Sequence, residues 1–269
     1  MFLINGLPGD ALPLQDRGLH YGDGLFETLA IDGGKPRLWP RHMARLVDGC
    51  SRLRIPPPDQ EVLARELTTL CEGQDAAVIK IIITRGSGGR GYQQPQPLMP
   101  TRIVARYPWP AMPDAPRGIA VRLCETRLGH NPRLAGIKHL NRLEQVLARA
   151  EWDNEDIQEG LLRDQDGYII EGISSNVFLV MQGILYTPSL KECGVDGVMR
   201  NLVMDAAHEL NLSCKSMPLS LEHLYEAQEV FLTNSLFGIR PVRTIVNIGD
   251  YDPGDITQRV QHKVSEMVL

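Results

Sequence analysis

The sequence predicts an α+β protein of two domains, the second of which is rich in antiparallel strands. In the first part of the chain strands alternate with amphipathic helices, whereas short strands separated by turn signals dominate the rest. Between them, residues 108–116 contain four prolines, which cannot continue a helix or a central strand. We interpret this segment as an interdomain linker, with a long surface loop as the alternative. The expected domains are a smaller one over residues 1–112 and a larger one over residues 117–269.

The first domain is expected to combine several strands with two helices. Strands are predicted at residues 2–14 (two short strands around the turn Pro8-Gly9-Asp10), 25–31, 76–84 and 101–107. Apolar residues at helical spacing predict a helix over residues 40–54, which the prolines at 56–58 end. Asp59 is expected to cap a second helix that runs through Cys71.

The second domain is expected to consist mostly of short strands. They are predicted at residues 119–124, 160–163, 168–172, 177–181, 184–187, 229–232 and 242–246. Turn signals between them, such as Asp-Gln-Asp-Gly before Tyr168, favour hairpins and therefore antiparallel pairing. Helices are predicted at residues 140–152 and 198–210.

The composition is that of an ordinary globular protein. With 269 residues, 43% of them hydrophobic, the chain can bury a core without disulfide or metal staples. The net charge of −5 argues against a nucleic-acid partner, and no apolar run approaches the ~20 residues of a membrane helix. The N-terminal residues do not resemble a signal peptide, and the five cysteines form no CxxC pair. We therefore expect a cytoplasmic enzyme with a small-molecule substrate and no metal ion.

A glycine-rich segment, Gly86–Gly91, matches the G-x-G-x-x-G pattern of dinucleotide-binding proteins and follows a predicted strand. That fingerprint requires a helix directly afterwards, to bind the pyrophosphate. The residues that follow, Tyr92-Gln93-Gln94-Pro95, will not start a helix. We interpret the segment as a flexible loop that presents Arg90 and Tyr92.

Lys138 is the strongest candidate for a nucleophilic amine. Only six of the 28 basic residues are lysines, and Lys138 is embedded in the largely apolar stretch Leu134–Leu140. A lysine in such surroundings is expected to be desolvated, which favours the neutral amine that forms a Schiff base. A surface lysine whose stem covers apolar neighbours is the alternative.

Other segments could hold the rest of a phosphorylated pyridine cofactor. Glu171 ends an apolar strand, where its carboxylate could bind a protonated ring nitrogen; a solvated edge-strand glutamate is the alternative. The turn Gly194–Gly197 leads into a helix whose first N–H groups could bind phosphate. Asn234 and Ser235 could add side-chain donors, and Arg45 a bidentate clamp. Each has an ordinary alternative, but together they are the groups that pyridoxal 5′-phosphate requires.

Several motifs resemble those of fold-type IV pyridoxal-phosphate enzymes, a family of branched-chain aminotransferases, D-amino-acid aminotransferases and 4-amino-4-deoxychorismate lyases. They are Gly22-Asp23-Gly24-Leu25-Phe26-Glu27-Thr28, His42-x-x-Arg45-Leu46, Glu171-Gly172-x-Ser174-Ser175-Asn176 and Gly197-Val198-Met199-Arg200. Within the family the chain is most similar to the bacterial lyases. That closer similarity lies in residues 1–6, 85–92 and 134–145.

The resemblance implies the two-domain fold-type IV architecture, with a smaller N-terminal α/β domain and a larger C-terminal domain. It also implies a role for each candidate residue. Lys138 would form the Schiff base, Glu171 would face the ring nitrogen, and the phosphate would be held by Arg45, the backbone of Val198 and Met199, and Asn234 with Ser235. A homodimer is implied, in which the loop carrying Arg90 and Tyr92 contacts the substrate carboxylates, in the same subunit or in the neighbour.

The implied activity is a lyase reaction that converts 4-amino-4-deoxychorismate to 4-aminobenzoate, a folate precursor, and pyruvate. The substrate amine would replace Lys138 on the cofactor, and the freed lysine would remove the C4 proton. Thr28 could relay a proton to the leaving fragment or orient Lys138, or could simply suit a strand. An aminotransferase of the same fold would differ over residues 86–92, and a non-catalytic pyridoxal-phosphate-binding protein would not need Arg90 and Tyr92.

Overall fold

The computed structural model describes residues 1–111 and 117–268, which belong to two compact units. Unit 1 comprises Met1–Ala111 and Ile137–Asn141, and unit 2 comprises Met112–Gly136 and Arg142–Leu269. The predicted linker lies partly outside the described residues, so its role and the domain boundary stay predictions. Among the described residues, no helix is both long enough and apolar enough to cross a membrane.

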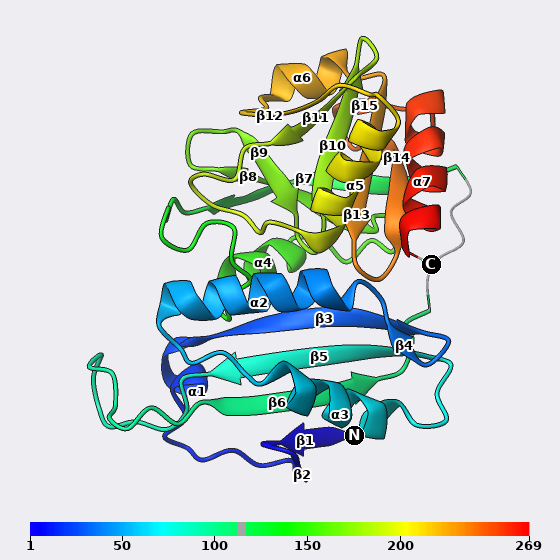
Figure 1. The fold of residues 1–269 in the computed structure, drawn as a ribbon. Helices are drawn as coiled ribbons and strands as arrows, with labels where there is room; N and C mark the ends of the chain where they lie inside the picture. The colour runs from blue at the N-terminus through cyan, green and yellow to red at the C-terminus, as the bar shows by residue number, and fades with distance from the viewer. Residues whose placement is uncertain (112–116, 269) are drawn as a thin grey trace. The chain divides into compact units, whose positions relative to one another are not determined.

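Unit 1 is a six-stranded antiparallel sheet with its two longer helices on one face (Figure 1). The strand order is β2 (Leu7–Pro8), β1 (Phe2–Ile4), β6 (Thr101–Tyr107), β5 (Ala76–Thr84), β3 (Gly24–Asp32) and β4 (Lys35–Pro36). The helices are α1 (Arg17–Tyr21), α2 (Trp39–Leu53) and α3 (Gln60–Cys71). Helix α2 packs on β3 and α3 on β6.

Alternation along β3 divides its side chains between the two faces of this sheet. Glu27 contacts side chains of α2, so it and its alternate neighbours Leu25 and Leu29 face the helices. Phe26 and Thr28 therefore project from the opposite face, where they are half-buried. This second face carries the residues on which the functional argument depends.

The segment Ile137–Asn141 lies along the edge of β3. The N–H of Phe26 donates to the carbonyl of Lys138 at 2.9 Å, and the N–H of Leu140 donates to the carbonyl of Gly24 at 3.0 Å. A side chain at Gly24 would place its Cβ 2.4 Å from the carbonyl oxygen of Ile83, so only glycine fits there. This pairing explains why the segment belongs to unit 1, although the sequence placed it in the second domain.

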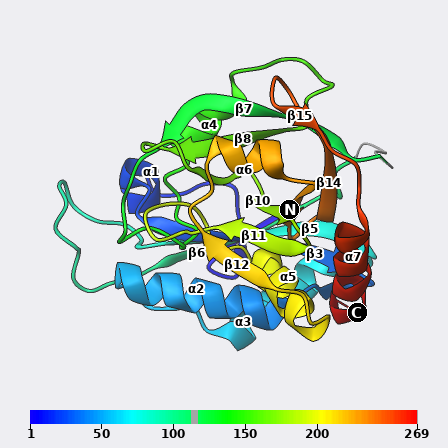
Figure 2. The same ribbon diagram turned by 90° about the horizontal axis from the view of Figure 1, so that it is seen from above.

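Unit 2 is a nine-stranded mixed sheet in which antiparallel pairs predominate (Figures 1 and 2). The strand order is β12 (Cys214–Met217), β11 (Ile184–Pro188), β10 (Asn176–Met181), β13 (Glu229–Asn234), β14 (Gly238–Ile245), β7 (Ile119–Leu128), β8 (Glu159–Asp164) and β9 (Ile169–Gly172), with β15 (Gly249–Asp250) paired to β14. The helices are α4 (Leu143–Arg149), α5 (Val198–Glu209), α6 (Leu221–Glu226) and α7 (Asp255–Val268). Helices α5 and α7 pack on β13 and on each other.

The predicted elements are largely confirmed, with the following corrections. The N-terminal hairpin turns at Asn5-Gly6 rather than at Pro8-Gly9-Asp10; both turn residues have positive φ, as the Asn-Gly preference of tight hairpins requires. The helix expected from residue 140 begins at Leu143, because Leu140 pairs with β3. Helices α1, α6 and α7 and strands β4, β12 and β15 were not predicted. Of these, α7 carries a visible signal, because its buried residues Thr257, Val260 and Val264 recur at helical spacing.

Candidate active site

Lys138 lies on the same face of the unit 1 sheet as Phe26 and Thr28, opposite the face on which α2 packs. Its backbone is fixed by β3, and its Nζ stands 4.5 Å from the centre of the Phe26 ring. The side chain is half-buried, and its role as the nucleophilic amine stays a prediction. An ammonium group over an aromatic face is attracted by the ring quadrupole, which positions the amine.

Thr28 shares this face with Phe26, one strand repeat further along β3. It is half-buried and stands directly opposite Lys80 of β5. The register therefore places the Thr28 hydroxyl on the face that carries the Lys138 amine, which is the placement that a proton-relay role needs.

Glu27, His42 and Arg45 form a buried group on the other face of β3. The Nε of Arg45 donates to Oε1 of Glu27 at 2.8 Å, a terminal guanidinium nitrogen of Arg45 donates to Oε2, and Nδ1 of His42 donates to Oε2 at 2.7 Å. Burial alone would raise the pKa of Glu27, but the charge and hydrogen bonds of Arg45 and the hydrogen bond of His42 lower it to about 2. Arg45 is therefore held in a fixed plane by an ionised carboxylate.

Glu27 and His42 stand in the motifs quoted for the family resemblance, but no role was predicted for either. Burial lowers the pKa of His42, and the nearby charges of Arg45 and Lys138 lower it further against the opposing effect of Glu27. The imidazole is neutral as a result, with its proton on Nδ1. A signal was present in the sequence: Glu27 occupies a helix-facing position of an apolar strand, and a buried carboxylate requires basic or hydrogen-bonding partners.

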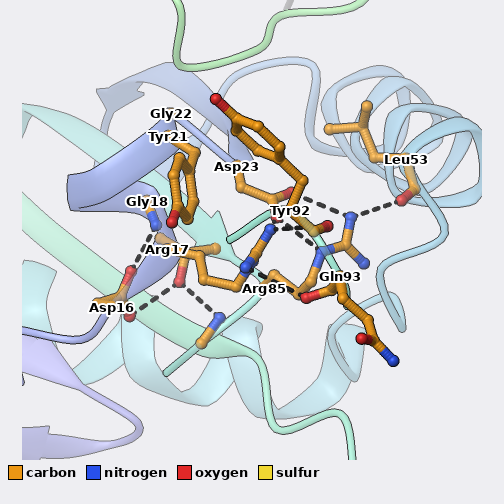
Figure 3. A network of polar contacts seen from close by, with 12 residues as sticks. Asp16, Arg17, Gly18, Tyr21, Gly22, Asp23, Leu53, Arg85, Tyr92 and Gln93 are labelled. Atoms are coloured by element: carbon orange, nitrogen blue, oxygen red, sulfur yellow. Dashed lines mark hydrogen bonds and ion pairs between the residues drawn. The ribbon is translucent and has the colours of Figure 1, made fainter. Parts of the chain in front are cut away.

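The glycine-rich loop is held by a network of charged side chains within unit 1. Figure 3 shows the guanidinium groups of Arg17 and Arg85 converging on Asp23. Arg17 also donates to the carbonyl of Gly91 at 3.0 Å, and Arg85 donates to the carbonyl of Leu53 at 2.8 Å. Burial raises the pKa of Asp23, but hydrogen bonds from Arg85 and then Arg17 outweigh this effect and lower it.

This network leaves the two predicted substrate contacts on the loop exposed. The Tyr92 side chain is 86% exposed, with its ring centre 5.5 Å from that of Tyr21, and Arg90 is exposed as well. Gly86 has a φ of +85°, and a Cβ there would lie 1.8 Å from the carbonyl oxygen of Met99. Glycine is therefore required at this position because two backbone segments approach closely. No helix begins between the loop and residue 101, so the helix that a dinucleotide-binding fingerprint needs is absent from this described segment.

In unit 2, Glu171 lies on β9 and is only 4% exposed. Its Oε2 accepts a hydrogen bond from the N–H of Val195 at 2.8 Å. Glu171 is therefore not the solvated glutamate of the alternative interpretation. A buried carboxylate requires hydrogen-bond partners, and the N–H of Val195 is one. The same loop is tied to the chain that leads to Lys138: the N–H of Gly136 donates to the carbonyl of Gly194 at 2.8 Å.

The N-terminus of α5 is suited to an anion. Its N-cap residue is Gly197, and no side chain caps the helix there. The first N–H groups, those of Val198 and Met199, can therefore donate to a bound anion. A Cβ at Gly197 would lie 1.9 Å from Oδ1 of Asn176, so the approach of the two segments requires glycine. Thr233 stands opposite Asn176 on the neighbouring strand, and its buried hydroxyl has no hydrogen-bond partner among the described residues.

Asn234 is the last residue of β13, and Ser235 follows it. The Asn234 amide donates to the carbonyl of Ser174 at 3.2 Å, and its oxygen accepts from the N–H groups of Leu236 and Phe237 at 2.9 and 3.0 Å. The Asn234 side chain thus shapes its own loop. Ser235, which is half-buried, remains the simpler side-chain donor of the pair.

Comparisons with known proteins agree with this chemistry. The model of the amino-transferase class IV family matches residues 24–245. An aminodeoxychorismate lyase of Vibrio harveyi is 37% identical over 97% of this chain and 98% of its own length. The crystal structure of 4-amino-4-deoxychorismate lyase from Pseudomonas aeruginosa is 44% identical with a TM-score of 0.94, covering 99% of this chain and 98% of that one. A branched-chain amino acid aminotransferase from Escherichia coli is 27% identical with a TM-score of 0.86, covering 99% and 93%.

Proposed function

Because the chain belongs to the amino-transferase class IV family, we propose that it is a pyridoxal-phosphate-dependent lyase that converts 4-amino-4-deoxychorismate to 4-aminobenzoate and pyruvate. Its fold is the fold-type IV architecture. The observation that carries the choice of reaction is the end-to-end similarity to the Pseudomonas aeruginosa lyase, at 44% identity against 27% for the Escherichia coli aminotransferase.

The residues present fit pyridoxal 5′-phosphate. A buried hydroxyl without a partner at Thr233 and the uncapped N-terminus of α5 suit a phosphate, and the buried carboxylate of Glu171 suits a protonated ring nitrogen. When bound, the cofactor supplies an electron-withdrawing ring that accepts the electron pair left when the C4 proton departs. Glu171 supports this role by keeping the ring nitrogen protonated.

Lys138 has two roles in the proposal. Its Nζ would hold the cofactor covalently and, when released from it, would take the proton from C4 of the substrate as the general base. The contact with Phe26 and the pairing with β3 hold the amine in place for both. Thr28 relays a proton or orients Lys138 as it changes from base to acid.

Groups from several elements would hold the phosphate. The backbone N–H groups of Val198 and Met199 and the hydroxyl of Ser235 would act as donors, with Asn234 shaping the last of these loops. Arg45 adds a positive charge whose orientation Glu27 fixes.

The remaining parts of the proposal concern the oligomeric state, the substrate contacts, the cellular compartment and the pathway. We propose a homodimer, because Phe2 and Tyr107 leave an exposed aromatic pair (41% and 42% exposed) on the unit 1 sheet. Arg90 and Tyr92, both exposed, contact the substrate carboxylates. The five free thiols support a reducing compartment, the cytoplasm, and the product 4-aminobenzoate places the reaction in folate biosynthesis.

The deciding experiment supplies the cofactor-loaded protein with 4-amino-4-deoxychorismate and measures 4-aminobenzoate and pyruvate. We expect both products in equal amounts, without any added 2-oxo acid. Amino-group transfer from a branched-chain or D-amino acid to 2-oxoglutarate, with no 4-aminobenzoate formed, would show instead that the protein is an aminotransferase.

A further inference from the structure

One buried carboxylate of unit 2, that of Glu159, has no role in the proposed reaction. Glu159 begins strand β8 and is only 7% exposed. Its Oε2 accepts hydrogen bonds from the hydroxyls of Ser174 at 2.7 Å and Ser175 at 3.2 Å. Burial raises the pKa of Glu159, and the hydrogen bonds from these serines and from the N–H of Gly160 only partly oppose this effect. A carboxylate buried at such a cost requires partners, and both hydroxyls come from one loop.

That loop, residues 172–176, joins β9 to β10 directly after Glu171. The N–H of Gly172 donates to the carbonyl of Ser175 at 2.7 Å and so closes a tight turn. A Cβ at Gly172 would lie 2.1 Å from Oγ of Ser175 and 3.3 Å from Cγ of Glu159, so only glycine fits there. The loop is thus folded around the Glu159 side chain, which reaches it from the neighbouring strand β8.

The far end of the loop is connected to Glu171 by hydrogen bonds. The side-chain amide of Asn176 donates to the carbonyl of Val195 at 2.9 Å, and the N–H of Val195 donates to Oε2 of Glu171 at 2.8 Å. Asn176 and Val195 are both buried. The position of the loop therefore determines where Val195 stands, and Val195 in turn orients the carboxylate that is proposed to face the ring nitrogen.

The middle of the loop is connected to the segment proposed to bind the phosphate. The carbonyl of Ser174 accepts a hydrogen bond from the side-chain amide of Asn234 at 3.2 Å. The oxygen of the same amide accepts backbone N–H groups and so shapes the loop that carries Ser235. Ser174 thus contacts Glu159 through its hydroxyl and Asn234 through its carbonyl. One serine therefore joins Glu159 to the phosphate-binding side of the site.

Resting on the proposed function, we propose that Glu159 is a positioning residue that holds the ring-nitrogen side and the phosphate side of the cofactor site at a fixed spacing. It acts through Ser174 and Ser175, and it needs no contact with the cofactor. The role requires a hydrogen-bond acceptor at the end of the side chain, since both hydroxyls are donors. A buried polar network whose members are all satisfied is rigid, so it can fix Glu171 relative to Ser235.

The test compares Glu159→Leu, which removes the acceptor, with Glu159→Gln, which keeps one. Ser174→Ala removes one hydroxyl from an exposed residue and leaves the core intact. The matched control is Glu229→Gln, because Glu229 is a carboxylate of unit 2 that is 8% exposed and accepts hydrogen bonds from Thr257 instead. Dissociation constants of pyridoxal 5′-phosphate and of pyridoxal are measured by equilibrium dialysis on full-length protein freed of cofactor, together with its melting temperature.

We expect Glu159→Leu to weaken binding of pyridoxal 5′-phosphate by about tenfold or more and Ser174→Ala by about threefold, the effects of losing two hydrogen bonds and one. Glu159→Gln and Glu229→Gln should bind as the wild type does. Pyridoxal has the same ring and aldehyde but no phosphate, so the ratio of the two dissociation constants measures what the phosphate adds. That ratio should fall in Glu159→Leu, because the two sides of the site are no longer held at the right spacing.

Wild-type affinity in a folded Glu159→Leu protein overturns the inference, and if that protein does not fold, wild-type affinity in Ser174→Ala overturns it. An equal loss of affinity in Glu229→Gln also contradicts it, since general destabilisation would then account for the effect. These outcomes are separate from the proposed function. A wild-type protein that makes no 4-aminobenzoate contradicts the proposed function, whereas one that makes it while Glu159→Leu binds the cofactor normally contradicts only the role of Glu159.

Discussion

Glu27 accepts hydrogen bonds from two nitrogens of Arg45, across the interface between strand β3 and helix α2. The carboxylate also accepts the Nδ1 proton of His42, so one buried acidic group fixes two basic side chains from the same helix. Arg45 is thus oriented by the protein itself, which in the proposed phosphate-binding role would reduce the conformational entropy that the side chain loses on binding.

This ion pair predicts a specific pH dependence of stability. The folded-state pKa of Glu27 is about 2, below the ordinary value of 4.5, so the carboxylate stabilises the fold above pH 4.5 and this contribution is lost as the pH falls toward 2. The shift corresponds to about 3 kcal/mol. Urea unfolding of the wild type and Glu27→Gln should differ by roughly this free energy at neutral pH and converge in acid.

The exposed Glu61→Gln on helix α3 is the matched control and should follow the wild type throughout. A Glu27→Gln protein with wild-type stability at neutral pH would show that the pair contributes nothing, because the desolvation of the two charges would then cancel their attraction.

Arg17 is expected to order the glycine-rich loop. Its guanidinium binds Asp23 and the carbonyls of Gly91 and Gln93, which are more than 70 positions away in the chain. Arg17→Met should speed amide hydrogen exchange over residues 86–93 and raise KM, while leaving the absorbance of the lysine-bound cofactor unchanged. The exposed Arg65→Met serves as control; loop exchange as slow as in the wild type would refute the role of Arg17.

Thr28 is expected to take part in proton transfer. Thr28→Val, which is nearly isosteric, should reduce 4-aminobenzoate formation while the absorbance band of the lysine-bound cofactor remains. A proton-transfer role is worth about 10²–10⁴-fold in rate. A reduction smaller than about threefold would contradict it, since a slight repositioning of Lys138 can account for so small an effect.

Glu171→Gln should fold and bind the cofactor but turn over slowly. A neutral amide no longer favours the protonated ring nitrogen, so the electron pair left at C4 is less stabilised. We expect kcat to fall by more than about tenfold, equivalent to ~1.4 kcal/mol of barrier. Wild-type turnover by this variant would mean that Glu171 has only a structural role.

The elements that could be predicted were those with strong local patterns. Strands β5 and β6 were predicted with their observed limits, because their apolar runs end at turn residues, and Asp59 caps α3 as its position before the helix indicates. The role of Lys138 rests on its apolar context and on motif resemblance, and it stays a prediction. These signals all lie within a few residues of the feature they predict.

The features that could not be predicted depend on contacts between distant residues. Glu27 meets Arg45 over 18 positions, and Arg17 meets Gly91 over 74, so no local pattern reports either pair. The late start of α4 has the same origin, because Leu140 pairs with β3 instead of continuing the helix. The position of Lys80 beside Phe26 likewise depends on the strand register.

The most direct test of the account is the identity of the lysine that carries the cofactor. The loaded protein is reduced with borohydride, which makes the lysine–cofactor bond permanent, and the digested peptides are mapped by mass spectrometry. We expect the pyridoxyl group on Lys138 alone, and its loss together with nearly all turnover in Lys138→Ala. A label on Lys80 or Lys191, or turnover by Lys138→Ala, would contradict the account.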